Sequence, residues 1–186
     1  MLTTTYQLLR SQDACDDRYG YLKEELRKRG HKGAIPLALI LEVNGLDDAL
    51  WALCAVPMRQ KKERDRLARL VACDYAERAL PAYEAEYPGD SRPRDTISCA
   101  RSFANGEATG AELAASRTAA SAAYWAAFSA AYWVAYWVAS SAASSAAYWT
   151  ASSVASNAAY WTASSVASNA AELKWQAGRL RHYLEA

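Results

Sequence analysis

The side chains best suited to metal binding or nucleophilic chemistry are four cysteines and two histidines, and they are scattered along the chain. The six residues are Cys15, Cys54, Cys73, Cys99, His31 and His182. No Cys-x-x-Cys pair is present, and ligands this dispersed do not fit a zinc site or a disulfide framework. Each cysteine lies within or beside an apolar helical pattern, which predicts buried, reduced thiols and no bound metal.

Acidic pairs are the second set of residues that could do chemistry, because two carboxylates can share general acid and base work on one substrate. The chain has Asp16 beside Asp17 and Asp47 beside Asp48. Neighbouring residues of a helix point to different faces, which is poor geometry for a two-carboxylate site. The sequence also contains no Gly-rich phosphate loop, no His-Glu-x-x-His and no nucleophile elbow. We therefore expect no catalytic residue, no cofactor and no enzymatic activity.

The charge of the chain is almost balanced, with 21 basic and 20 acidic residues among 186 and a formal net charge of +1. A balanced surface gives no overall attraction to nucleic acid or to anionic membranes, so we expect neither as a partner. An apolar content of 52% is enough for a core of its own. The first residues lack the basic and apolar regions of a secretory signal, which together with reduced cysteines favours a cytoplasmic protein.

A sharp change of composition divides the chain into two parts. All charged residues lie in 1–117 or 172–186, and none lies in 118–171. The first part predicts a compact, charged helical bundle over 1–110. The second part, 111–186, predicts long alanine-rich helices followed by an amphipathic C-terminal end. The predicted fold class is therefore all-α.

Helices of the charged part can be placed from their caps and spacing. Acids precede bases over 13–29, as the helix dipole favours. Asp47 or Asp48 is placed to cap a helix that follows Gly45 and ends at Pro57. No segment shows the alternating pattern of a strand, so we expect no sheet.

A longer helix is predicted from about Lys61 to Leu80, where Pro81 should end it. Its apolar residues recur at steps of three and four and should face a core. They are Leu67, Leu70 and Val71. Beyond a loop, Ser91 is placed to cap a further helix over 95–104.

An alanine repeat fills the uncharged part of the chain. The stretch YWTASSVASNAA occupies 148–159 and recurs unchanged at 160–171, and alanine takes every fourth position from Ala115 to Ala171. Alanine favours helix, and a four-residue period makes the alanine stripe drift around the helix in a right-handed sense. Two arrangements remain open: long helices wound around partners, or several antiparallel helices.

A surface without charge cannot stay solvated, so this tail must pack on the charged part, on a second copy or on a partner. Packing on a second copy would make a homo-oligomer. The residues expected to pack or to assemble are Trp125, Trp133, Trp137, Trp149, Trp161, Ala147 and Ala159. The segment is long enough to span a membrane, but its many Ser, Thr and Asn residues and its lack of Leu and Ile argue against that.

A resemblance to a known family is carried by two stretches, GLDDALWALCAVP and RLARLVACDYAERALPAYEAEYPGDSRPRDTISCARSFANGEAT. The segment from about 36 to 110 resembles the immunity proteins of bacterial polymorphic toxin systems. The alanine-rich tail and the ending AELKWQAGRLRHYLE are similar to that family as well, although Tyr-Trp and Ser-rich pairs replace most of its charges. The resemblance implies a protein that binds and neutralises a cognate toxin and catalyses nothing.

The matching polar and aromatic residues are the partner-binding residues that the resemblance implies. They are Asp47, Asp48, Trp51, Asp74, Glu77, Arg78, Arg92 and Arg94. Each also has a structural interpretation, as a helix cap or as an ion pair such as Asp74 with Arg78 four residues on. The competing class is a structural or self-assembling protein that uses the tetrad-repeat tail as its assembly surface.

Overall fold

The computed structural model describes residues 1–116 and 169–186. Within these ranges the protein is helical apart from one two-stranded sheet, which confirms the all-α class. The elements in chain order are β1 (Thr3–Thr4), α1 (Tyr6–Ser11), α2 (Asp16–Lys28), β2 (Ile35–Pro36), α3 (Leu37–Asn44), α4 (Leu46–Ala52), the short 3-10 helices η1 (Leu53–Ala55) and η2 (Met58–Gln60), α5 (Lys61–Glu86), α6 (Arg92–Asn105) and α10 (Asn169–Glu185). Residues 110–116 are also helical.

The residues predicted to pack or to assemble in the tail all fall between 117 and 168. They are Trp125, Trp133, Trp137, Trp149, Trp161, Ala147 and Ala159. They lie outside the described ranges, and so does the choice between one long helix and several. The structure of the repeat and any oligomer formed through it therefore stay predictions.

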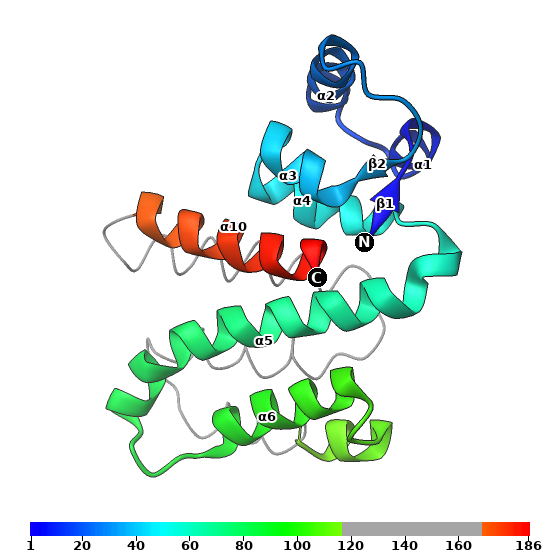
Figure 1. Cartoon of the computed structure of the whole chain (residues 1–186). Helices are drawn as coiled ribbons and strands as arrows, with labels where there is room; N and C mark the ends of the chain where they lie inside the picture. Colours follow the sequence, from blue (N-terminus) through cyan, green and yellow to red (C-terminus); the bar gives the residue numbers. More distant parts are fainter. Residues whose placement is uncertain (117–168) are drawn as a thin grey trace.

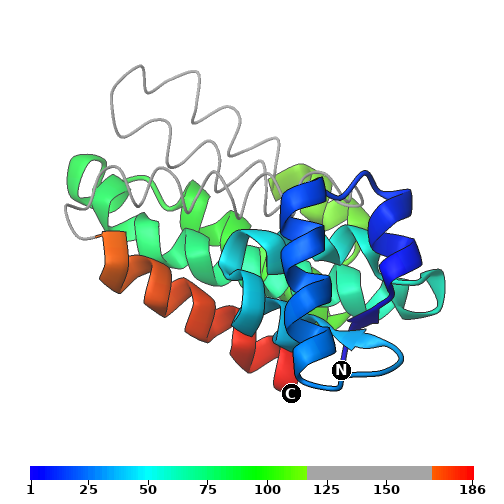
Figure 2. The same ribbon diagram turned by 90° about the horizontal axis from the view of Figure 1, so that it is seen from above.

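Helix α10, although it is the last element of the chain, packs between the first helices and α5. Figure 1 shows α10 between α3 and α4 on one side and α5 on the other, with α6 against the far side of α5. The views in Figures 1 and 2 both place the N and C termini close together. The charged C-terminal end is thus part of the same packed body as the first helices.

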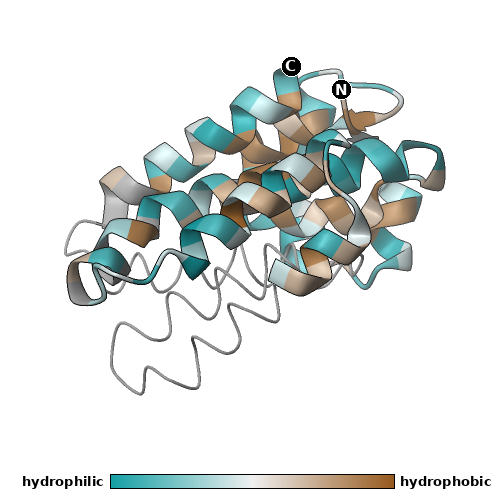
Figure 3. Cartoon of the chain, turned by 90° about the horizontal axis from the view of Figure 1, so that it is seen from below, coloured by the Kyte–Doolittle hydropathy of each residue, from teal (hydrophilic) through white to brown (hydrophobic). Residues whose placement is uncertain are grey.

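The main hydrophobic core gathers residues from both ends of the chain. Leu2 and Leu9 join Leu180 and Leu184 in one cluster with buried residues of α3, α4 and the first half of α5. All four leucines are at most 3% exposed. In Figure 3 the apolar residues gather between the helices while the outer turns are mainly hydrophilic. This burial is the main force that holds α10 in place.

Helix α5 joins this core to a second, smaller one against α6. The α5 residues in the main core are Leu67, Ala68, Val71 and Tyr75, and those in the second are Cys73, Ala76 and Leu80. The steps of three and four within the first set are the helical spacing that the sequence predicted, and Leu70 is buried as well. A helix with two apolar faces can connect two layers of the bundle.

Helix α5 continues through Pro81 to Glu86, so the predicted end at Leu80 is wrong. Proline removes one hydrogen bond and crowds the preceding turn, which costs roughly 3 kcal/mol in a helix interior. Contacts with α6 flank the proline: Leu80, directly before it, is only 4% exposed and lies in the second core, and Glu84, beyond it, is hydrogen-bonded to Arg94. Tertiary contacts override the local signal here.

The two-stranded sheet is a second departure from the predicted pattern. Strands β1 and β2 pair antiparallel, with Thr4 opposite Ile35. The Thr4 hydroxyl donates to the carbonyl of Ala55 at 2.6 Å, and Ile35 is fully buried. Strands of two residues are too short to show a sequence period, so no pattern could reveal them. The pair fixes the start of the chain to the main core.

Gly45 forms the turn between α3 and α4 with a φ of 90°. Glycine adopts this backbone conformation without strain, so the helix boundary predicted at this residue is confirmed. Asp47 and Asp48 lie in the first turn of α4, but neither side chain caps the helix, so the predicted cap is wrong. Their charges still favour the helix N-terminus.

We expect Leu180→Ala to lower the free energy of unfolding by about 2–5 kcal/mol, because the leucine is fully buried and its loss leaves a cavity. Urea unfolding followed by circular dichroism measures this. Leu173→Ala on the same helix is the matched control. Leu173 is 39% exposed, so its truncation should change stability by less than about 1 kcal/mol. Equal effects would contradict the position of α10.

Candidate functional site

Asp74, in the middle of α5, is a charged residue with only 5% exposure. Arg101 of α6 lies 2.8 Å from one carboxylate oxygen. Arg179 of α10 contacts the other oxygen through Nε and Nη2, at 2.7 and 2.5 Å. Arg101 also pairs with Glu77 at 2.7 Å. Asp74 and Glu77, two of the predicted partner-binding residues, therefore help to join α5 to neighbouring helices.

The protonation of this cluster follows from its contacts. Burial lowers the pKa of Arg101, but hydrogen bonds to Glu77 and Asp74 outweigh burial, so the pKa lies above its ordinary value. The pKa of Arg179 is raised by the same balance, with Asp74 as its partner. Burial and a hydrogen bond with Asp74 raise the pKa of Tyr183. Both arginines stay charged at neutral pH, and the tyrosine stays neutral.

Helix α10 makes further contacts with α5 next to this cluster. The Tyr75 hydroxyl donates to the carbonyl of Gln176 at 2.9 Å, and the rings of Tyr75 and Trp175 lie 6.0 Å apart. The guanidinium of Arg78 lies 5.2 Å from the centre of the Trp175 ring. Such cation–π contacts stabilise exposed sites modestly. Arg78, another predicted binding residue, thus has a structural contact while remaining exposed.

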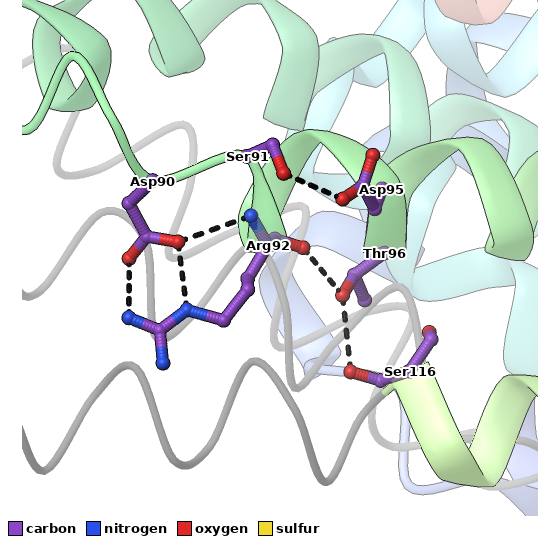
Figure 4. Close-up of polar contacts among 6 residues, drawn as sticks. All are labelled: Asp90, Ser91, Arg92, Asp95, Thr96 and Ser116. Atoms are coloured by element: carbon purple, nitrogen blue, oxygen red, sulfur yellow. Dashed lines mark hydrogen bonds and ion pairs between the residues drawn. The ribbon is translucent and has the colours of Figure 1, made fainter.

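The predicted binding residues Arg92 and Arg94 lie at the start of α6. The guanidinium of Arg92 forks onto Asp90, with hydrogen bonds of 2.7 and 2.8 Å (Figure 4). Arg94 makes a similar fork onto Glu84 of α5, at 2.7 and 2.6 Å. Bidentate pairs of this kind fix side-chain geometry, although exposed pairs contribute little to stability.

The start of α6 also differs from the prediction. The helix begins at Arg92 rather than at residue 95, and Ser91 makes no capping hydrogen bond but donates to Asp95 at 2.8 Å. The Thr96 hydroxyl lies 2.8 Å from the Arg92 carbonyl and 3.1 Å from that of Ser116 (Figure 4). This buried hydroxyl therefore ties the helical residues 110–116 to α6.

A pocket of about 350 Å³ opens at the other end of the molecule, where α1, α2, α3 and α4 meet. Its lining residues are Leu9, Asp13, Ala14, Cys15, Arg18, Tyr19, Leu22, Ile40, Asn44, Asp47, Asp48, Trp51 and Ala52. The structure thus brings Asp47, Asp48 and Trp51 together in one place. The other predicted binding residues lie on α5 and α6 and do not line this pocket.

A polar network holds one wall of the pocket. Arg18 of α2 is hydrogen-bonded to Asp48, which raises the pKa of the arginine. The Asn44 amide donates to Asp48 at 2.7 Å and to the Arg18 carbonyl at 3.1 Å. The Asp48 side chain is only 17% exposed, whereas Asp47 is an exposed residue. The adjacent acids therefore differ: Asp48 links α2, α3 and α4, and Asp47 stays accessible.

The cysteines are all free thiols, but they are not all buried as the sequence predicted. Burial raises the pKa of Cys54 and of Cys73 to about 12. Cys15 is exposed, because it precedes the first turn of α2 and follows Asp13, whose φ is 58°. The chain turns at this point, so the apolar pattern does not carry Cys15 into the core.

The described part of the chain contains neither a candidate metal site nor a candidate membrane-spanning helix. Within residues 1–116 and 169–186, no three His, Cys, Asp or Glu side chains are grouped so that they could hold a metal ion. In the same ranges no helix combines the length and the apolar character needed to cross a bilayer.

Comparison with known protein families finds a match over residues 59–183 to the family described as Imm-5 like putative immunity protein. The match covers two thirds of the chain. The chain belongs to this immunity-protein family. The matched range includes the whole Asp74 cluster, whereas every residue that lines the pocket precedes it. A comparison with curated proteins and one with solved structures each find no significant match.

Sequence reasoning missed several residues that organise this immunity protein, above all Arg101 and Arg179. They lie 27 and 105 positions from Asp74, so no local spacing could pair them. One signal was present: Asp74 continues the helical spacing of Leu67, Leu70 and Val71, and a carboxylate on a buried face requires a cationic partner. The sequence could therefore predict the need for partners but not their identity.

We expect Asp74→Asn to destabilise the immunity protein by roughly 3 kcal/mol, because it leaves two guanidinium groups without their shared carboxylate. This value is at the lower end of the cost of breaking a buried ion pair, since the side chains of Arg101 and Arg179 are still 29% and 38% exposed. Asp16→Asn is the control: Asp16 pairs with Arg10 but is 86% exposed, so its loss should cost less than about 1 kcal/mol. Chemical denaturation compares the two variants, and similar midpoints would argue against the cluster.

We expect the thiols to react at very different rates with a disulfide reagent at pH 8. A pKa of about 12 leaves Cys54 and Cys73 with roughly a thousandfold less thiolate than an ordinary cysteine. Exposed Cys15 should therefore contribute to the fast phase. Cys15→Ser should reduce the amplitude of that phase, whereas Cys73→Ser should leave it unchanged. A fast phase that depends on Cys73 would show that the second core is open.

Proposed function

We propose that this protein binds a cognate bacterial toxin and neutralises it by occupying a surface that the toxin needs, without catalysing a reaction. The observation that carries the proposal is the family match over residues 59–183. An inhibitor that works by binding needs a stable surface with fixed side chains. The forked pairs Arg92 with Asp90 and Arg94 with Glu84 supply fixed charges of that kind on α6.

The charge pattern supports recognition by local features. A net charge of +1 provides little long-range steering, so a partner has to be selected by the shape and charge of a patch. We propose that accessible members of the predicted set, among them Asp47, Arg78 and Arg94, contribute to such patches. Asp48 and Asp74 contribute indirectly, since both are engaged within the fold.

Self-assembly is the second candidate function, and the repeat in the sequence favours it. The identical stretches at 148–159 and 160–171 would present the same surface twice, so one interface could be used repeatedly. Sedimentation of the full chain distinguishes the two functions. An immunity protein acting as a single copy stays a monomer until toxin is added, whereas an assembling protein sediments as an oligomer alone.

The direct test begins with the neighbouring genes: a toxin-like protein encoded there is the partner to test, and its absence would favour self-assembly. We expect co-expression of the full immunity protein to restore growth of cells that express the toxin, and the two purified proteins to elute together from a sizing column. An unrelated toxin serves as the specificity control and should not be neutralised. Unrestored growth together with separate elution would contradict the proposed function.

A further inference from the structure

The pocket between α1 and α4 has an excess of negative charge. Its lining includes the carboxylates of Asp13, Asp47 and Asp48 against the single guanidinium of Arg18. Arg18 neutralises Asp48, to which it is hydrogen-bonded. Asp13 and Asp47 are exposed, and neither carboxylate accepts a hydrogen bond from any residue in the described ranges. Asp47 also attracts Arg18 electrostatically, but with three aspartates and one arginine the lining keeps an excess of negative charge.

The polar atoms of the pocket are also acceptors in excess of donors. The amide nitrogen of Asn44 is used by Asp48 and by the Arg18 carbonyl. The amide oxygen Oδ1 of Asn44 is buried and has no hydrogen-bond partner among the described residues. This oxygen has no accessible surface, so the acceptors that a ligand can reach are the carboxylates of Asp13 and Asp47.

The rest of the lining is apolar or aromatic. Leu9, Leu22, Ile40 and Ala52 supply aliphatic surface, and Trp51 adds a large, half-buried ring. Such a wall suits the methylene stem of a long side chain, and an indole face attracts a cation. The pocket therefore combines an apolar lining, an aromatic wall and an acidic, acceptor-rich rim.

We propose that this pocket receives an arginine side chain presented by the partner protein. A guanidinium offers five N–H donors in a planar fork, which matches carboxylates better than a lysine ammonium does. Its head binds the exposed carboxylates of Asp47 and Asp13, and its stem packs on the apolar lining. Arg18 and Asp48 stay paired and position the wall. That the partner is a toxin rests on the proposed function.

The first test needs no toxin. Isotopically labelled full-length protein is titrated with N-acetyl-arginine amide and with N-acetyl-citrulline amide, which has the same shape without the charge. We expect saturable shifts of the Asn44 amide and Trp51 indole resonances, with a dissociation constant about tenfold lower for the arginine probe. Asp47→Asn should remove this preference. Equal responses to both probes, or none at these residues, would overturn the proposal.

The second test uses the toxin and separates the two proposals. Asp47→Asn should weaken toxin binding about tenfold, and more so at low salt, where charge pairing is strongest. Glu185→Gln removes an exposed carboxylate on α10, outside the pocket, and should bind like the parent. Parent-like binding by Asp47→Asn overturns the pocket proposal but leaves toxin neutralisation standing. Failure of the parent to bind the toxin, with the arginine probe still preferred, refutes only the toxin as partner.

Discussion

The carboxylate of Asp74 is the interaction on which the arrangement of the helices depends. A charge at 5% exposure is tolerable only if cations meet it inside the protein. Here the cations come from opposite sides, Arg101 on α6 and Arg179 on α10. The carboxylate of α5 can therefore be satisfied only when both neighbours are docked, which makes the position of each helix a condition for the other. Apolar burial supplies the driving force, and the ion cluster selects the arrangement.

The sequence predicted those features that rest on local rules. The spacing of Leu67, Leu70 and Val71 identified the buried face of α5, and Gly45 identified the break after α3, because both signals act over one helical turn. Pro81 misled because α5 contacts α6 on both sides of it, through Leu80 in the second core and through Glu84, which pairs with Arg94. The position of α10 could not be predicted, since residues far apart in the chain decide it.

The candidate site shows the same division between local and distant information. Asp47, Asp48 and Trp51 are close in sequence, so their grouping followed from one short helix. Their pocket is completed by residues of α1, α2 and α3, among them Leu9 and Arg18, whose approach depends on the fold. The two adjacent aspartates therefore have different roles, because Asp48 is paired with Arg18 whereas Asp47 is exposed to solvent. Residue type alone does not distinguish these roles.

The packing of α10 against α3, α4 and α5 has a consequence for folding during translation. A ribosome releases Tyr75 roughly a hundred residues before Leu180, which at about 5–20 residues per second is an interval on the order of 5–20 s. During that time the faces of α3, α4 and α5 that contact α10 have no α10 to cover them. The first helices therefore expose apolar surface to solvent, where chaperones can bind it. The body closes only after α10 has been made, so a nascent chain that lacks α10 lacks part of its core.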